Sequence, residues 1–189
     1  MKILFATLAL LVGKATFAQS WIDYELVLKQ HADKVVTSTD PSGDLRRELH
    51  MGTGVRVSCT GPVGNASCLG IDFTKFGAIG CGFAIINELR HVALECPGFA
   101  TDSELSVLDQ RSRLMAQFIL DNSVPPLGPE DMDRLLAGKS WDGPLNCAAD
   151  AARDSDIYNM MRAIVDQDLP PDPAEHLGPS RLPVMNPCL

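Results

Sequence analysis

Six cysteines constrain the fold of this 189-residue chain more than any other feature. They are Cys59, Cys68, Cys81, Cys96, Cys147 and Cys188. No two of them have the Cys-x-x-Cys spacing of zinc ribbons, thioredoxin-like redox sites or haem attachment. In an oxidising compartment, such cysteines are expected to form three structural disulfides.

The N-terminus has the features of a secretory signal peptide over residues 1–18. Lys2 gives a short positive start, residues 3–12 are uncharged and apolar, and Thr16 and Ala18 supply small residues before a cleavage site after Ala18. The apolar run covers about half of the roughly 20 residues that a membrane-spanning helix needs. The sequence therefore predicts a secreted or periplasmic protein without a transmembrane anchor, and this export places the cysteines in an oxidising compartment.

The composition is that of a folded, acidic protein. Hydrophobic residues make up 46% of the chain and charged residues 21%, values far from those of a disordered protein. Asp and Glu number 24 against 16 Lys and Arg, which gives a net charge of −8 at pH 7. Because a nucleic-acid groove needs clustered Lys and Arg, no nucleic-acid partner is expected.

Apolar periodicity predicts a mainly α fold of the α+β type, with one small β-hairpin and disulfides as staples. A single helical domain is expected over residues 19–168, followed by a proline-rich tail over 169–189 that Cys188 pins to the body. The hairpin pairs residues 55–59 with 66–71, and Thr101 and Glu104 fit a capping box. The predicted helices cover residues 21–37, 44–50, 83–95, 102–121, 129–138 and 145–167, the last as one helix or two.

The hairpin and the 83–95 helix narrow the disulfide pattern. Cys59 and Cys68 are equidistant from the centre of the turn, so they face each other across the two strands. Cys81 and Cys96 flank the helix, which would hold them about 22 Å apart, beyond the roughly 7 Å that a disulfide can bridge. Two patterns remain: either Cys81 pairs with Cys147 and Cys96 with Cys188, or Cys81 pairs with Cys188 and Cys96 with Cys147.

One helical segment carries the best candidate for catalysis or metal binding. Glu88, His91 and Glu95 recur at spacings of three and four residues, so a helix would place them on one face. Two carboxylates beside an imidazole could hold a divalent metal or orient the histidine as a general base. A single Glu-x-x-His is a short motif of low specificity, and a solvated helix face with ordinary charge pairs is the favoured interpretation.

Two further segments invite a functional interpretation. The glycine-rich run over residues 76–86 resembles a phosphate-binding loop only loosely, because no Lys-Ser/Thr follows it; helix packing explains the glycines more simply, and the run would be a docking surface if exposed. The aspartates between residues 150 and 168 lack the glycine and distal glutamate of a calcium-binding EF-hand loop. No cofactor is therefore expected.

Two functions from different classes follow from these features. The favoured one is a non-catalytic binding module, in which the acidic C-terminal half or the apolar 76–86 run engages an unknown protein or a small ligand. The alternative is an extracellular hydrolase or metal-binding protein that uses Glu88, His91 and Glu95. The absence of the Gly-x-Ser-x-Gly and His-Glu-x-x-His motifs favours the module without catalysis.

Overall fold

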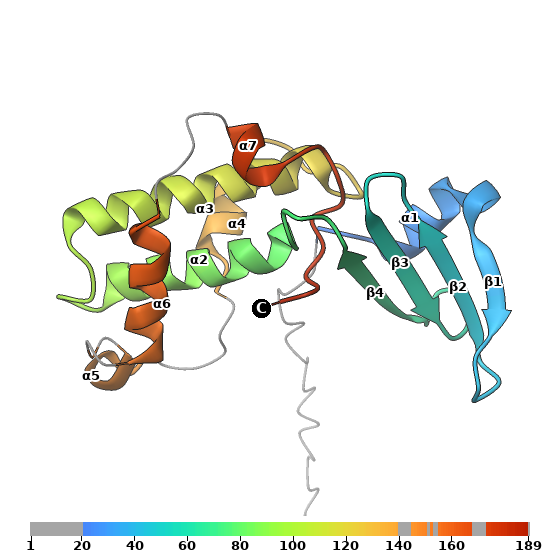
Figure 1. Ribbon diagram of the computed structural model, residues 1–189, viewed down its shortest axis with the longest axis horizontal. Helices are drawn as coiled ribbons and strands as arrows, with labels where there is room; N and C mark the ends of the chain where they lie inside the picture. Colours follow the sequence, from blue (N-terminus) through green and yellow to red (C-terminus); the bar gives the residue numbers. More distant parts are fainter. Residues whose placement is uncertain (1–20, 140–144, 151, 153–154, 168–172, 189) are drawn as a thin grey trace, which may run out of the picture.

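The computed structural model describes residues 21–139, 145–150, 152, 155–167 and 173–188, and the predicted signal peptide lies outside them. A four-stranded sheet with α1 lies at one end of the molecule and the remaining helices lie at the other. The C-terminal segment, residues 181–188, runs between them (Figure 1). The described elements are α1 (Tyr24–Gln30), a 3₁₀ helix (Ala32–Lys34), β1 (Val36–Thr39), β2 (Leu45–His50), β3 (Val55–Thr60), β4 (Ser67–Asp72), α2 (Ile79–Glu95), α3 (Asp102–Asn122), α4 (Asp131–Ala137), α5 (Cys147–Asp150), α6 (Asp156–Val165) and α7 (Pro173–Leu177).

The sheet corrects the predicted fold class. The fold is α+β, but its β part is an antiparallel sheet in the order β1-β2-β3-β4, so the prediction of one small hairpin is wrong. The predicted hairpin is present as β3 and β4, with Cys59 opposite Cys68. Residues 36–37 and 45–50, predicted to be helical, form the start of β1 and all of β2 instead.

Local chemistry explains both errors. Residues 35–39 are Val-Val-Thr-Ser-Thr, and a run rich in β-branched side chains packs better on a pleated strand than in a helix. The first helix therefore ends at Gln30 rather than at residue 37. In β2 the alternation of apolar and polar residues is hard to recognise, because Arg47 lies between Leu45 and Leu49 on the same face of the strand. The charge of Arg47 is paired with Glu25 of α1.

Helix α1 packs on one face of the sheet. Tyr24, Val27 and Leu28 are buried on the helix, and the strands bury Leu49, Val55, Val57 and Cys59 against it. Asp23 caps the helix by accepting a hydrogen bond from the N–H of Leu26 at 2.9 Å. The buried residues of β3 alternate with partly exposed ones, as expected for a sheet with one face in the core.

The other end is built on a hairpin of α2 and α3, which lie side by side (Figure 1). Leu89, Val92, Leu108 and Ile119 are completely buried in their core, and α4, α6 and α7 pack around the pair. Helix α2 begins at Ile79, four residues earlier than predicted. The first turn of α2 requires glycine at position 80, because a Cβ there would meet the carbonyl oxygens of residues 183 and 184.

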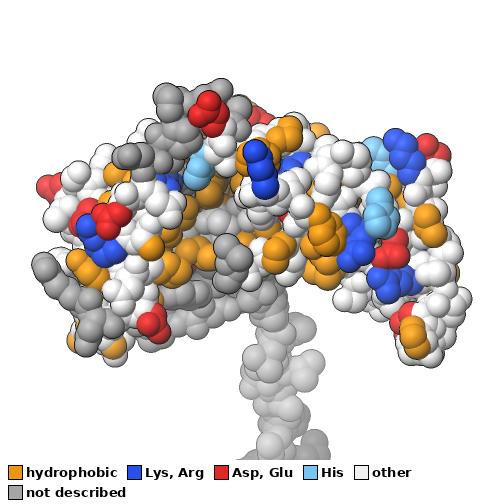
Figure 2. Space-filling view, viewed as in Figure 1, with side chains coloured by type: hydrophobic (Ala, Val, Ile, Leu, Met, Phe, Trp, Pro, Cys, Tyr) orange, Lys and Arg blue, Asp and Glu red, His pale blue; other side chains and the backbone are white. Residues whose placement is uncertain are grey.

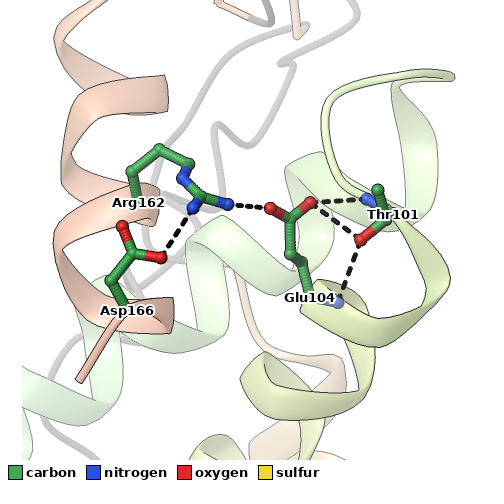
Figure 3. Close-up of polar contacts among 4 residues, drawn as sticks. All are labelled: Thr101, Glu104, Arg162 and Asp166. Carbon is green, nitrogen blue, oxygen red and sulfur yellow. Dashed lines mark hydrogen bonds and ion pairs between the residues drawn. The ribbon is translucent and has the colours of Figure 1, made fainter. Parts of the chain in front are cut away.

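The predicted capping box is present at the start of α3. The Thr101 N–H donates to the Glu104 carboxylate at 2.7 Å, and the Glu104 N–H donates to the Thr101 hydroxyl at 3.3 Å. Figure 3 shows that the same carboxylate faces Arg162 of α6, which also pairs with Asp166 at 2.6 Å. The cap of one helix thus fixes the position of another.

The C-terminal segment is part of the core. Arg181, Leu182 and Val184 are buried, although the proline content of this region predicts no regular structure. The carbonyl of Asn186 accepts a hydrogen bond from the N–H of Asp72 at 2.8 Å, so the segment covers the outer edge of β4. Its first residue is tied to the same place, because Arg181 Nε donates to the Asp72 carboxylate at 2.5 Å.

Three disulfides join these parts. Cys59 pairs with Cys68 across β3 and β4, Cys96 with Cys147, and Cys81 with Cys188, which is one of the two patterns left open by the sequence. The last bond links the C-terminal segment to α2. One disulfide therefore cross-links two strands of the sheet, and the other two attach α5 and the C-terminal segment to α2.

Candidate functional site

The three residues of the predicted catalytic or metal site do not form an open cluster. Glu88 and His91 are 2% and 8% exposed within α2, whereas Glu95 is exposed at its end and pairs with Lys139. Within the described residues, the metal-ligand atoms of Glu88, His91 and Glu95 do not all lie within 4.8 Å of one another. The structure thus places Glu88 and His91 in the helical core and directs Glu95 elsewhere.

The His91 side chain is buried in α2. Its Nε2 atom has no hydrogen-bond partner within the part of the chain that the structure describes. It does not line the cleft described below. A catalytic histidine must reach both an orienting partner and the substrate, whereas His91 lies buried in α2, away from that cleft.

The two surfaces proposed for docking differ in accessibility. Most of the apolar 76–86 run is buried as the first half of α2, so it contributes to the core rather than to a docking surface. Acidic side chains are exposed at Glu130, Asp133 and Asp156. On the face shown in Figure 2, acidic side chains are dispersed, and several lie beside basic ones. No single acidic patch dominates that face.

A cleft of about 550 Å³ lies between α1 and the sheet. Its walls come from α1, the 3₁₀ helix, β1, β2 and the turn that joins β3 to β4. The lining residues are Asp23, Glu25, Leu26, Leu28, Lys29, Ala32, Val35, Thr37, Arg47 and Val63. Clefts of roughly 300–1,000 Å³ are typical of sites for small ligands.

An ion pair between Glu25 and Arg47 forms the polar part of the cleft. The Arg47 guanidinium donates to the two Glu25 carboxylate oxygens at 2.6 and 2.7 Å, in the bidentate geometry that makes such pairs strong. This hydrogen bonding lowers the pKa of Glu25 and raises that of Arg47. The backbone of Gly64, in the β3–β4 turn, also contributes to the lowered pKa of Glu25.

The rest of the lining combines apolar side chains with opposite charges. Leu26, Val35 and Val63 supply apolar contact, while Lys29 and Asp23 lie at exposed positions. Lys29 makes no ion pair within the described part of the chain. A ligand in this cleft could therefore bury an apolar group and place an anionic group beside Lys29.

Metal binding is not supported at this cleft. Glu25 is close to Cys59 and Cys68, and the three ligand atoms lie within 4.8 Å of one another. The two sulfur atoms are joined in a disulfide, so they are not thiolates, which are the form of cysteine that binds metals. The Glu25 carboxylate is already occupied by Arg47.

The sequence did not identify this cleft, because its two key residues were predicted to lie on separate helices. Glu25 and Arg47 are 22 positions apart and meet only when residues 45–50 form a strand beneath α1. The available signal was the alternation of Leu45, Arg47 and Leu49. This alternation predicts a strand only if a charged residue is accepted on the face of the sheet that packs against α1.

No family model, curated protein sequence or solved structure matches this chain. Within the described residues, no helix is both long enough and apolar enough to cross a membrane.

Proposed function

We propose that the protein is an exported binding module without catalytic activity, and that its binding site is the cleft between α1 and the sheet. The observation that carries the proposal is the cleft of about 550 Å³, whose lining includes the Glu25–Arg47 ion pair. Three disulfides support a location outside the reducing cytoplasm, either in the periplasm or outside the cell.

The chemistry of the lining favours a small peptide-like ligand that has both an apolar group and a charged group. Apolar walls contribute affinity in proportion to the area that they bury. Lys29 and Asp23 would select the orientation of the ligand, because opposite charges on the cleft attract opposite ends of a zwitterion. The Glu25–Arg47 pair holds the walls in place before the ligand binds, which reduces the cost of ordering them.

The test is a titration of the ¹⁵N-labelled protein with free amino acids and tripeptides, followed by NMR. The proposal predicts that the amide signals of Leu26, Thr37 and Val63 shift, because these residues surround the cleft. Ala32 lines the cleft and is exposed, so Ala32→Trp should block the shifts. Ala137→Trp, on an exposed alanine of α4, is the matched control and should leave them unchanged.

Two results would count against this function. The first is a set of shifts around His91 in place of the cleft, which would favour a site in the helical half. The second is binding that is equally strong in the Ala32→Trp variant and the control, since the ligand would then lie outside the cleft.

A further inference from the structure

The two edges of the sheet differ. The edge of β4 is covered, because Asp72 donates a backbone hydrogen bond to Asn186 of the C-terminal segment. Strand β1 pairs only with β2 within the described residues, and all four of its residues are exposed. An uncovered edge presents unpaired backbone groups that can bind another strand.

The backbone groups that face outward can be assigned from the hydrogen-bond pattern. The N–H of Asp40 donates to the carbonyl of Asp44 at 2.9 Å, in the same register that pairs β1 with β2. In an antiparallel pair the bonded positions alternate, so Val36 and Ser38 also direct their backbone groups to β2. Thr37 and Thr39 therefore direct theirs away from the sheet.

Strand β1 lacks the charged and proline residues that often protect an edge. Its sequence is Val-Thr-Ser-Thr, with no charged residue and no proline. Val36, with 62% of its surface exposed, is among the most exposed large apolar residues of the described chain. Natural edge strands are commonly blocked by lysine, proline or a bulge; β1 has only its shortness as protection, so this edge can pair over a few residues.

The charges at the ends of β1 are complementary to those of a second copy. Lys34 precedes the strand and is exposed, whereas Asp40 and Asp44 follow it. If two β1 strands pair antiparallel with Thr37 opposite Thr37, the end of β1 that follows Lys34 in each copy lies beside the end that carries Asp40 and Asp44 in the other. The same register places Val36 opposite Ser38, and no like charges meet.

We propose that two copies of the protein pair through β1, with Thr37 on the twofold axis, to form one continuous eight-stranded sheet. A twofold axis perpendicular to the sheet keeps α1 of both copies on the same face. Because Thr37 also lines the cleft, the two clefts then lie next to each other across the axis. The short strand buries less than the roughly 1,200–2,000 Å² of a stable interface, so the dimer is weak and depends on concentration.

Cysteine cross-linking tests the register. In a hydrogen-bonded antiparallel pair the Cα atoms are about 5.5 Å apart, which a disulfide can bridge, so Thr37→Cys should cross-link to itself under mild oxidation. Thr39→Cys is the matched control: it is a threonine of the same strand and face, but it lies about 13 Å along the strand from its own copy. The native cysteines are all in disulfides and should not compete.

Sedimentation of the unmodified protein over a concentration series, from about 10 μM to about 1 mM, measures the dimer directly. A rise in mass with concentration, abolished by Thr37→Lys and little changed by Thr39→Lys, is expected because only the first change places like charges on the axis. A monomer at every concentration overturns the proposal. A dimer that survives Thr37→Lys, or that cross-links equally through Thr39→Cys, also overturns it.

Self-association is measured without a ligand, so its outcome is separate from that of the cleft proposal. If the protein stays a monomer but the cleft amides still shift with tripeptides, the binding function stands and the dimer is rejected. If the dimer forms and no ligand shifts those amides, the opposite holds.

Discussion

The ion pair between Arg181 and Asp72 should be among the most sensitive points of the fold, since both side chains are completely buried. Arg181 Nη2 also donates to the Gly77 carbonyl at 2.9 Å, and its guanidinium lies 5.3 Å from the centre of the Phe118 ring. The second Asp72 oxygen accepts the N–H of Thr74 at 2.7 Å. Each Asp72 carboxylate oxygen thus accepts a hydrogen bond from the protein, and the side chain is completely buried.

The change Asp72→Asn keeps the shape of the side chain and removes its charge. The amide has one oxygen and one NH₂ group, so it can accept from Arg181 or from Thr74 but not from both. The guanidinium is then buried without a counter-charge. Removing one partner of a buried ion pair costs about 3–5 kcal/mol of the free energy of unfolding. For a protein of this size that corresponds to a fall in Tm of about 6–20 °C.

Urea unfolding followed by circular dichroism, with the disulfides intact, measures this loss. Asp33→Asn is the control: Asp33 is exposed, and the change should alter the free energy of unfolding by less than about 0.5 kcal/mol. The double change Asp72→Leu with Arg181→Met removes both charges, and it should be less destabilising than Asp72→Asn alone. A loss below about 1 kcal/mol for Asp72→Asn would refute the reasoning, because it would mean that the pair is hydrated.

Two other predictions concern stability. The capping hydrogen bond from Thr101, followed by smaller contributions that include Arg162, lowers the pKa of Glu104 below its usual value. Its ionised form therefore stabilises the fold above the unfolded pKa of about 4.3, and this stability is lost as the pH falls through the lower folded pKa; Glu104→Gln should flatten the dependence of the urea midpoint on pH in that range. Gly70→Ala should lower the free energy of unfolding by about 1–3 kcal/mol, because the new Cβ meets both Val184 and the Tyr24 ring. Gly52→Ala, where the Cβ meets nothing within 4 Å, is its control, and equal effects of the two changes would contradict the packing argument.

The parts of the fold that were predicted correctly are specified by neighbouring residues. The start of α3 follows from Thr101 and Glu104, which satisfy each other's backbone groups within one turn of helix. The β3–β4 hairpin and its disulfide follow from the symmetric spacing of two cysteines about a turn. In each case the residues that determine the structure lie within ten positions of one another.

The parts that were missed depend on contacts between distant segments. Strand β2 contains an inward-facing arginine that is acceptable only because Glu25 lies above it. The C-terminal segment was predicted to be an irregular tail, yet it is buried because Asp72 neutralises Arg181 and β4 offers an edge to Asn186. The cleft between α1 and the sheet requires both the strand and the ion pair, so no local pattern could have indicated it.

The burial of residues 181–188 has a consequence for the timing of folding. This segment follows every other described element in the chain, yet it supplies the hydrogen bond that covers β4, the buried cation and one cysteine of the Cys81–Cys188 bond. While the chain is being synthesised, the sheet and the helical hairpin are complete before residues 181–188 exist. The contacts that join the two halves through this segment therefore form late in folding.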